Sequence, residues 1–475
     1  MEPERSGSGM PVPPPPPPDP SRGRRIVRWV LATLGTQGVV MALNLATGIL
    51  SARVMGPDLK GIYNAVILWP GVFFSLTSMG LSAAFTSMYA RAPGPERRRI
   101  FAVAAAMALL WGTVGAVLCT VFAPRLLAHL GPQVRVWVLI GSWVPVPTNA
   151  TYVCSALLSV EERFGWLNWI NASRAVTVAL GLVALALWHQ LNPYTQLTLV
   201  WATAFLSSLP GMIMATRAAL RLPRGRAGPA WTRLSAQLTA LGVRFYAINL
   251  ASTFNAQLDS MLSTIWLSAT QIGLYAVASS GVSVVAAISG AFATVFFPMA
   301  AADDAATIAR RTSTALRRAL LVFLAVELVL VLLARPVLAL MYGTRYLGAW
   351  TAVLALAPEA VFTSCIGVLY SGCYAAREFV VPAVGEVVGA ASGFGLLLLF
   401  IPRWGIAGAG AAGSLSYGLD LLTVTVLWAR RQGVPVRDLV PRRADAQAVA
   451  DLSLRQAREL ARRGLRLGRL APPAA

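Results

Sequence analysis

Long apolar runs, separated by short polar segments rich in arginine, make up most of the chain. The first six lie at residues 27–50, 62–90, 100–122, 134–158, 167–188 and 197–218, and six more lie at 238–267, 273–299, 316–334, 350–371, 380–401 and 406–429. Because about 20 helical residues cross the hydrocarbon core of a bilayer, we expect each run to span it. The pattern predicts an all-α polytopic membrane protein with about 12 transmembrane helices.

A basic segment in the middle of the chain divides these runs into two groups of six. We expect a first six-helix lobe at 26–220, a basic cytoplasmic linker at 221–236 and a second six-helix lobe at 237–430. A disordered, proline-rich cytoplasmic N-terminus at 1–25 and a basic, partly amphipathic cytoplasmic tail at 431–475 complete the predicted organisation. The two lobes are expected to surround a central cavity.

Polar residues recur along one face of the first and the seventh apolar run. The seventh run carries Arg244, Ser252, Asn255, Asp259 and Ser263 at helical spacing, and the first carries Thr33, Gln37, Asn44, Thr47 and Ser51. Similar tripeptides follow, Gly-Ile-Tyr at 61–63 and Gly-Leu-Tyr at 273–275. Since lipid disfavours such polar faces, we expect both stripes to line one shared cavity between two repeats, as in a transporter.

Composition supports a membrane protein and argues against other classes. The 475 residues are 56% hydrophobic and 12% charged, with a mean hydropathy of +0.64, which excludes an ordinary soluble protein. The net charge of +21 does not indicate nucleic acid as a partner, because the arginines lie in short clusters between apolar runs. Their distribution over the loops predicts a multi-pass protein of the plasma or inner membrane with both termini cytoplasmic.

No motif indicates a cofactor, a metal site or the active site of an enzyme. The four cysteines lie inside apolar runs without paired ligand spacing, and the chain has no nucleotide-binding loop. In the tail, residues 444–469 place Val449, Leu452, Gln456 and Leu460 at helical spacing among arginines. This segment is either an amphipathic helix on anionic lipids of the inner leaflet or a solvated, partly disordered tail.

Four stretches, in this order, resemble a known family. They are SARVMGPDLKGIY at 51–63, Asn255 and Asp259 followed by GLYAVASSGVSVVAAISGAFATVFFP at 273–298, LALMYGTRYLGA at 338–349, and PAVGEVVGAASGFGLLLLFIPRWGIAGAGAAGSLSY at 382–417. Together they resemble the polysaccharide transporters, the Wzx-type O-antigen flippases, of the multidrug/oligosaccharidyl-lipid/polysaccharide (MOP) exporter superfamily. The resemblance covers nearly the whole membrane region.

The resemblance implies a fold of twelve to fourteen helices in two lobes around a V-shaped cavity. It also implies a function, the movement of lipid-diphosphate-linked sugars by alternating access. The chain departs from the family pattern in the eleventh helix, where Glu386 and Gly389 stand in place of the common Asn. The lipid II flippase branch of the superfamily typically has fourteen helices, whereas this chain is expected to have about twelve.

Three arginines are candidates for binding a diphosphate, which needs fixed positive charge inside the cavity. Arg174 lies within the fifth run, Arg244 near the inner end of the seventh, and Arg53 at the outer end of the first. The alternative for each is that the side chain snorkels to the lipid headgroups. From the polar stripes, Asn255, Gln37 and Asn44 are further candidates for the cavity wall.

Five carboxylates lie inside apolar runs, where charge is costly and a function is the default expectation. They are Asp259, Glu327, Glu359, Glu386 and Asp420. These residues are expected to pair with the arginines or to carry a coupling proton or sodium ion. The alternative is a packing role, above all for Glu327, which has no polar neighbour in sequence and suits a protonated carboxyl bonded to another helix.

The favoured function is a flippase that moves a lipid-linked oligosaccharide from the inner to the outer leaflet, with polysaccharide-synthesis enzymes as possible partners. A cation-coupled exporter of drugs or metabolites is the first alternative. A non-transporting scaffold for glycan synthesis is the second. A glycan polymerase or glycosyltransferase is disfavoured, because such enzymes need a sizeable outer loop and the predicted outer loops are short.

Overall fold

The computed structural model describes residues 20–222, 230–300 and 304–451, and every regular element in these ranges is helical. The longer helices are α1 (Pro20–Thr77), α2 (Leu81–Arg91), α3 (Gly94–Leu126), α4 (Pro132–Gly141), α5 (Pro145–Val160), α6 (Phe164–Leu187), α7 (Pro193–Arg221), α8 (Trp231–Trp266), α9 (Ala269–Ala300), α10 (Ala305–Val337), α11 (Trp350–Ala375) and α12 (Val380–Gln432). Short turns are η1 (Ala128–Leu130), η2 (Leu338–Tyr342), η3 (Thr344–Ala349) and η4 (Val436–Leu439).

Eight of the described helices are long and apolar enough to cross a membrane. Two of them, α1 and α12, are long enough to cross the membrane twice. Each is broken by a glycine with positive φ, Gly56 in α1 (φ 74°) and Gly405 in α12 (φ 57°). The pair α4–α5 and the more polar α8 match the fourth and seventh predicted runs. The membrane fold with about twelve helices is therefore confirmed.

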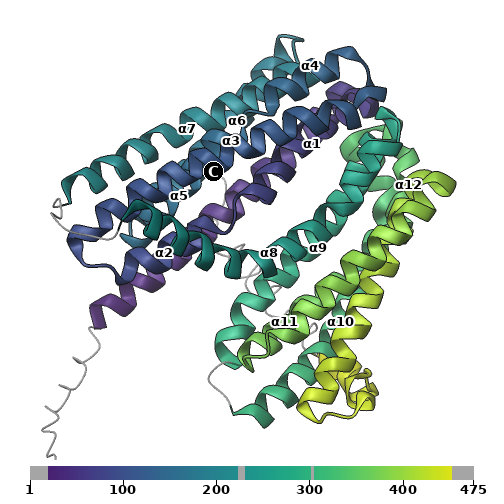
Figure 1. The fold of residues 1–475 in the computed structure, drawn as a ribbon. Helices are drawn as coiled ribbons and strands as arrows, with labels where there is room; N and C mark the ends of the chain where they lie inside the picture. Colours follow the sequence, from purple (N-terminus) through teal and green to yellow (C-terminus); the bar gives the residue numbers. More distant parts are fainter. Residues whose placement is uncertain (1–19, 223–229, 301–303, 452–475) are drawn as a thin grey trace, which may run out of the picture.

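The helices form two lobes that α8 connects. In Figure 1 the long helices α1, α3, α6 and α7 run roughly parallel in one group with the shorter α2, α4 and α5, and α9 to α12 form the other group. The first part of α8 packs on the first lobe, where Leu234 and Leu238 are buried among residues of α2, α3 and α5. Its second part packs on α12, and Asn255 there contacts Glu386. Helix α8, which carries the polar stripe of the seventh predicted run, thus extends from one lobe to the other.

The lobes touch at one end through the two tripeptides that the sequence repeats. A Cβ on Gly61 would lie 1.8 Å from the Ala269 carbonyl oxygen, and a Cβ on Gly273 would lie 2.0 Å from the Pro57 carbonyl oxygen. Only glycine permits this approach of α1 and α9. We call the contact of residues 57–61 with 269–273 the junction.

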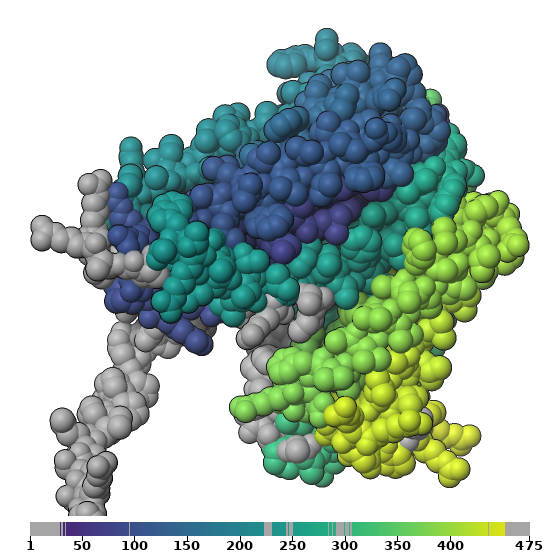
Figure 2. All heavy atoms as spheres, in the orientation of Figure 1, coloured from purple at the N-terminus to yellow at the C-terminus, as the bar shows by residue number. Residues whose placement is uncertain are grey.

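Side chains extend the junction on both sides. The Trp69 indole N–H donates to Thr264 Oγ1 at 3.2 Å, and the Tyr346 hydroxyl donates to the Ala52 carbonyl at 3.1 Å. From this end the two lobes diverge, and Figure 2 shows the surface hollowed between the blue-teal first lobe and the green-yellow second lobe. The molecule is therefore a V that is closed at the junction.

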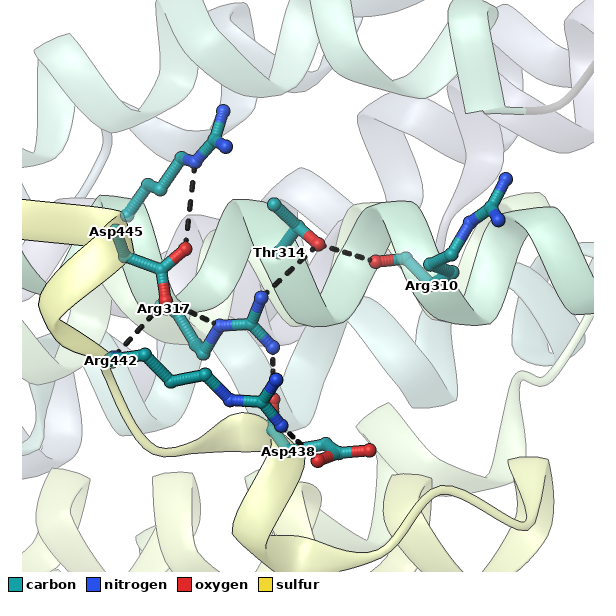
Figure 3. Close-up of polar contacts among 7 residues, drawn as sticks. Arg310, Thr314, Arg317, Asp438, Arg442 and Asp445 are labelled. Carbon is teal, nitrogen blue, oxygen red and sulfur yellow. Dashed lines mark hydrogen bonds and ion pairs between the residues drawn. The ribbon is translucent and has the colours of Figure 1, made fainter. Parts of the chain in front are cut away.

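The segment that follows α12 folds back onto the N-terminal half of α10 (Figure 3). Arg317 on α10 binds the Asp445 carboxylate, with Nε 2.8 Å from Oδ2, and also donates to the Asp438 carbonyl. The Arg442 amide donates to Asp445 Oδ2 at 3.1 Å at the start of a helix over 443–451. The sequence predicts disorder for residues 1–25. Residues 1–19 lie outside the described residues, whereas residues 20–25 belong to α1. Most of the predicted amphipathic tail, 452–475, also lies outside the described residues.

Candidate functional site

Asp259 and Glu359 form the first half of a cluster of carboxylates inside the second lobe. Helix α8 carries Asp259, whose Oδ2 accepts a hydrogen bond of 2.5 Å from the hydroxyl of Tyr275 on α9. Glu359 of α11 lies within electrostatic range of Asp259. Its own Oε2 is buried and has no hydrogen-bond partner. Two acids and one buried tyrosine thus share a small volume between three helices.

Glu386 and Asp420, both on α12, form the second half. Asn255, one turn before Asp259 on α8, donates from Nδ2 to Glu386 Oε2 at 3.2 Å. Asp420 is 1% exposed, its Oδ1 is fully buried, and it lies within electrostatic range of Glu386. The structure therefore brings together four of the five predicted carboxylates, which we call the acidic cluster: Asp259, Glu359, Glu386 and Asp420.

Glycines of α12 make the room that these side chains occupy. A Cβ on Gly385 would lie 2.4 Å from Asp420 Oδ1, and one on Gly389 would lie 2.9 Å from Asn255 Nδ2. A Cβ on Gly413 would lie 2.2 Å from Glu359 Oε2. The absence of side chains at these three positions is what allows carboxylates to enter a helix interface that would otherwise be filled.

Tyr417 lies within electrostatic range of all four carboxylates, so it marks the centre of the acidic cluster. In the part of the chain that the structure describes, no ion pair joins any of the four to a lysine or an arginine. The predicted pairing with arginines is not found there. Buried acids without basic partners must be neutral or must bind a cation. Among the described residues no three His, Cys, Asp or Glu side chains are grouped closely enough to hold a metal ion on their own.

The first lobe contains a contrasting basic site. Lys60, the only lysine of the chain, is 8% exposed and donates from Nζ to Ser51 Oγ at 3.0 Å, while the ammonium lies 4.7 Å from the centre of the Tyr63 ring. Ser51 in turn donates to Gln196 Oε1 at 2.7 Å. Arg174 of α6 is exposed and lies within electrostatic range of Tyr63. Of these two groups of side chains, the basic one thus belongs to the first lobe and the acidic cluster to the second.

The remaining candidates lie away from both groups. Gln37 and Asn44 are exposed along the first part of α1, and Arg53 is exposed three residues before the break at Gly56. The side chain of Arg244 lies outside the described residues. The structure therefore provides no contact between these four candidates and the acidic cluster.

Glu327 is separate from the other carboxylates. It is 9% exposed, its Oε2 has no partner, and it lines an apolar cavity of about 240 Å³ between α9, α10 and α11. Among the described residues of that cavity wall, hydroxyl groups come from Ser280 and Tyr342. The sequence-based expectation that Glu327 bonds to another helix has no counterpart among the described contacts.

Sequence reasoning missed the tyrosines and the lysine of these two sites. Tyr417 lies three residues before Asp420, one helical turn away, and Tyr275 ends the Gly-Leu-Tyr tripeptide, so both positions carried a signal. Lys60 lies between the SARVMGP motif and Gly61, and its being the only lysine was the available clue. Its burial depends on the fold of α1 against α7 and could not be derived from spacing.

Comparisons with known proteins agree with this architecture. A family model described as "Polysaccharide biosynthesis protein" matches residues 26–302, which is more than half of the chain. A search of curated protein sequences finds no match.

Solved structures share the fold at low sequence identity. The lipid II flippase MurJ, in an inward closed conformation, has a TM-score of 0.66 at 14% identity, covering 87% of this chain and 89% of that one. An inward-facing multidrug resistance transporter of the MATE family has a TM-score of 0.60 at 11% identity, covering 83% and 94%. A MOP superfamily transporter from Pyrococcus furiosus has a TM-score of 0.56 at 12% identity, covering 86% and 95%. The chain belongs to the polysaccharide biosynthesis protein family, and its fold is that of the MOP superfamily.

Proposed function

We propose that this protein is a flippase that moves a lipid-diphosphate-linked oligosaccharide from the inner to the outer leaflet by alternating access. The observation that carries the proposal is the V of two repeats, closed at one end by glycine-on-glycine packing, in a member of the polysaccharide biosynthesis family. With the N-terminus in the cytoplasm, as the loop charges predict, the junction is the outer end and the cleft faces inward. This is the state that would accept a substrate from the inner leaflet of the plasma or inner membrane.

The separation of charge between the lobes suggests how the work is divided. Arg174 in the first lobe is the best-placed candidate for the diphosphate, because it is exposed and keeps its forked donors free of any ion pair to a described carboxylate. The acidic cluster in the second lobe is the candidate for coupling. A proton or a sodium ion that binds there would remove the repulsion among the four acids and favour one orientation of α8.

Tests of this function start from cells in which no other flippase serves the same glycan. Loss of the protein should leave the lipid-linked glycan on the cytoplasmic side, detected as loss of surface glycan with accumulation of its precursor. Surface glycan at the normal level in such a strain would refute the proposal. The same readout should be applied to Asp259→Asn, which removes one carboxylate of the acidic cluster.

A cation-coupled exporter of drugs or metabolites is the second candidate, and the acidic cluster favours it. Unpaired buried acids would suit a cationic cargo as well as a coupling ion. Efflux of cationic dyes distinguishes the two functions. The exporter predicts that dye accumulates in cells without the protein, whereas the flippase predicts no change. The other expected partners, anionic inner-leaflet lipids at the tail and polysaccharide-synthesis enzymes, stay predictions.

A further inference from the structure

One pocket at the border of the two lobes differs from every charged site described above. It has a volume of about 250 Å³ and lies where α1 ends and α2 begins, with α5 on one side and α8 on the other. Its polar lining comes from hydroxyl and amide groups: Ser75, Ser78, Ser82, Asn149, Tyr152, Tyr246 and Thr253. No lysine, arginine, aspartate or glutamate is among the described residues that line it. We call it the hydroxyl pocket.

An aromatic platform forms one wall of the hydroxyl pocket. The rings of Phe74 and Tyr152 pack with their centroids 4.8 Å apart, and Tyr152 is 53% exposed. A sugar ring has a face of C–H groups and a rim of hydroxyls, so it needs a flat apolar surface and several hydrogen-bond partners at once. An ion or a phosphate would instead need charge that this pocket does not provide.

The backbone at the pocket is interrupted, as is common where transporters bind their cargo. Met79 (φ 48°) and Gly80 (φ 60°) take left-handed conformations between α1 and α2. The carbonyls of Ser75 and Leu76 at the end of α1 accept the Tyr246 hydroxyl at 2.8 and 2.6 Å. The Tyr246 hydrogen bonds therefore tie α8 to the end of α1 beside the pocket. Ser78 lines the pocket from the break between α1 and α2, and Ser82 lines it from the first turn of α2.

From these observations we propose that the hydroxyl pocket binds one neutral sugar ring, stacked on Tyr152 and hydrogen-bonded by the surrounding hydroxyls and by Asn149. The size suits a single ring, since pockets for drug-sized ligands begin at about 300 Å³. This inference rests on the proposed function and adds where the glycan is recognised. Because α8 supplies Tyr246, Leu250 and Thr253 to the wall, a bound sugar touches the helix that connects the lobes.

Tyr152 provides the test, because two substitutions separate its ring from its hydroxyl. Binding of a panel of methyl hexosides and N-acetylhexosaminides to the purified full-length protein is measured by saturation-transfer NMR. At least one sugar should bind the native protein. Tyr152→Ala should weaken that binding at least tenfold, whereas the matched control Tyr152→Phe keeps the platform and should stay within about threefold. Inorganic pyrophosphate should not displace the sugar.

In the binding experiment, three results would overturn the inference: no sugar of the panel binds, Tyr152→Ala binds as tightly as the native protein, or pyrophosphate displaces the sugar. Failure of the proposed function has a different signature. In that case the purified protein binds sugar and Tyr152→Ala weakens the binding, but the protein moves no lipid-linked glycan in vesicles. This result would refute the flippase function and leave the sugar site standing. Transport that Tyr152→Ala leaves unchanged in KM would refute the sugar site alone.

Discussion

At the scale of single residues, the acidic cluster is held by shape and hydrogen bonds, without opposite charge. Asp259 keeps its place through the Tyr275 hydroxyl, and Glu386 through Asn255. Burying two carboxylates near each other costs free energy that a structural role would not require. For this reason we propose that the cluster binds a cation or a proton.

Asp259→Asn tests that explanation. The amide retains the size of the side chain and can still accept a hydrogen bond from Tyr275, but it carries no charge and no acidic proton. We expect transport to fall at least tenfold while the melting temperature of the purified protein stays the same or rises, because one unpaired buried acid is removed. Glu327→Gln, outside the cluster, is the matched control and should transport normally. Full transport by Asp259→Asn would remove this residue from the mechanism.

Gly413→Ala tests the space around Glu359. The new methyl carbon would lie 2.2 Å from Glu359 Oε2, so the carboxylate must move out of its site. We expect a destabilisation of about 1–3 kcal/mol together with loss of coupling. Gly395→Ala on the same helix is the control, since nothing lies within 4 Å of its added Cβ. Thermal unfolding and transport by both variants are compared, and equal behaviour of the two would contradict the geometry.

The carboxylates themselves could be picked out from the sequence, since each is an acid in an apolar run. Their arrangement could not, because Asp259, Glu359 and Asp420 lie on three helices that are far apart in the chain. Spacing places residues on a face of one helix but does not tell which helices share an interface. For the same reason, only the structure could show that no described arginine forms an ion pair with the acidic cluster.

At the scale of elements, the junction depends on glycine at equivalent positions of the two repeats. Gly61→Ala would place a methyl carbon 1.8 Å from the Ala269 carbonyl oxygen, so α1 and α9 must separate. We expect the equilibrium to shift from the inward-facing toward the outward-facing state. An introduced cysteine on the cleft side of the lobes should then react more slowly with a cytoplasmic thiol reagent. The four native cysteines are buried, which reduces their background.

Gly71→Ala is the control for that experiment, because it lies on the same helix and nothing lies within 4 Å of its added Cβ. It should leave the labelling rate unchanged. If Gly61→Ala behaves like Gly71→Ala, the packing of the two tripeptides does not hold the outer end closed. Gly273→Ala should repeat the effect of Gly61→Ala from the other lobe.

The stability of the contact between α10 and the segment after α12, shown in Figure 3, is expected to depend on pH. Burial by itself raises the pKa of the Asp445 carboxyl, but hydrogen bonds from Arg317 and the Arg442 amide and the charges of Arg317 and Arg318 bring it below its ordinary value. A depressed pKa in the folded state stabilises the contact fully above about pH 4, and this stabilisation is lost as the pH falls through the folded-state value. Near neutral pH the contact should therefore be independent of pH.

Asp445→Asn should weaken the same contact at every pH, because it leaves Arg317 without its anionic partner. Hydrogen exchange over residues 434–451 should become faster, while exchange in α11 stays unchanged. Asp438→Asn is a milder control, since Arg317 binds the Asp438 backbone carbonyl and only Arg442 binds its carboxylate. Native-like protection in Asp445→Asn would show that apolar packing of Leu439 is sufficient to hold the tail.

Most helices could be predicted from the sequence, including the breaks near Gly56 and Gly405, because apolar length and Gly-Pro punctuation are local signals. The path of α8 from one lobe to the other could not be predicted from the sequence. Its stripe of polar residues indicated a cavity, but its packing on both lobes follows from Leu234 and Leu238 at one end and Asn255 at the other. Those contacts exist only once the two lobes are assembled.

At the scale of the whole molecule, three regions have separate chemistry. The first lobe carries the exposed Arg174 and the buried Lys60, the second lobe carries the acidic cluster, and the neutral hydroxyl pocket lies at their border. A lipid-linked oligosaccharide has a diphosphate, sugar rings and an apolar tail, so a flippase needs different surroundings for each part. The division of charge suits such a cargo better than it suits a small cation alone.

Transport in vesicles tests this account most directly. The purified protein is reconstituted with a fluorescent lipid-diphosphate-linked oligosaccharide, and a membrane-impermeant reagent that destroys the label reports how much lies in the outer leaflet over time. The account predicts exchange between leaflets that requires the protein, responds to an imposed proton or sodium gradient, and falls at least tenfold in Asp259→Asn. Exchange no faster than in empty vesicles, with a correctly folded protein, would contradict it.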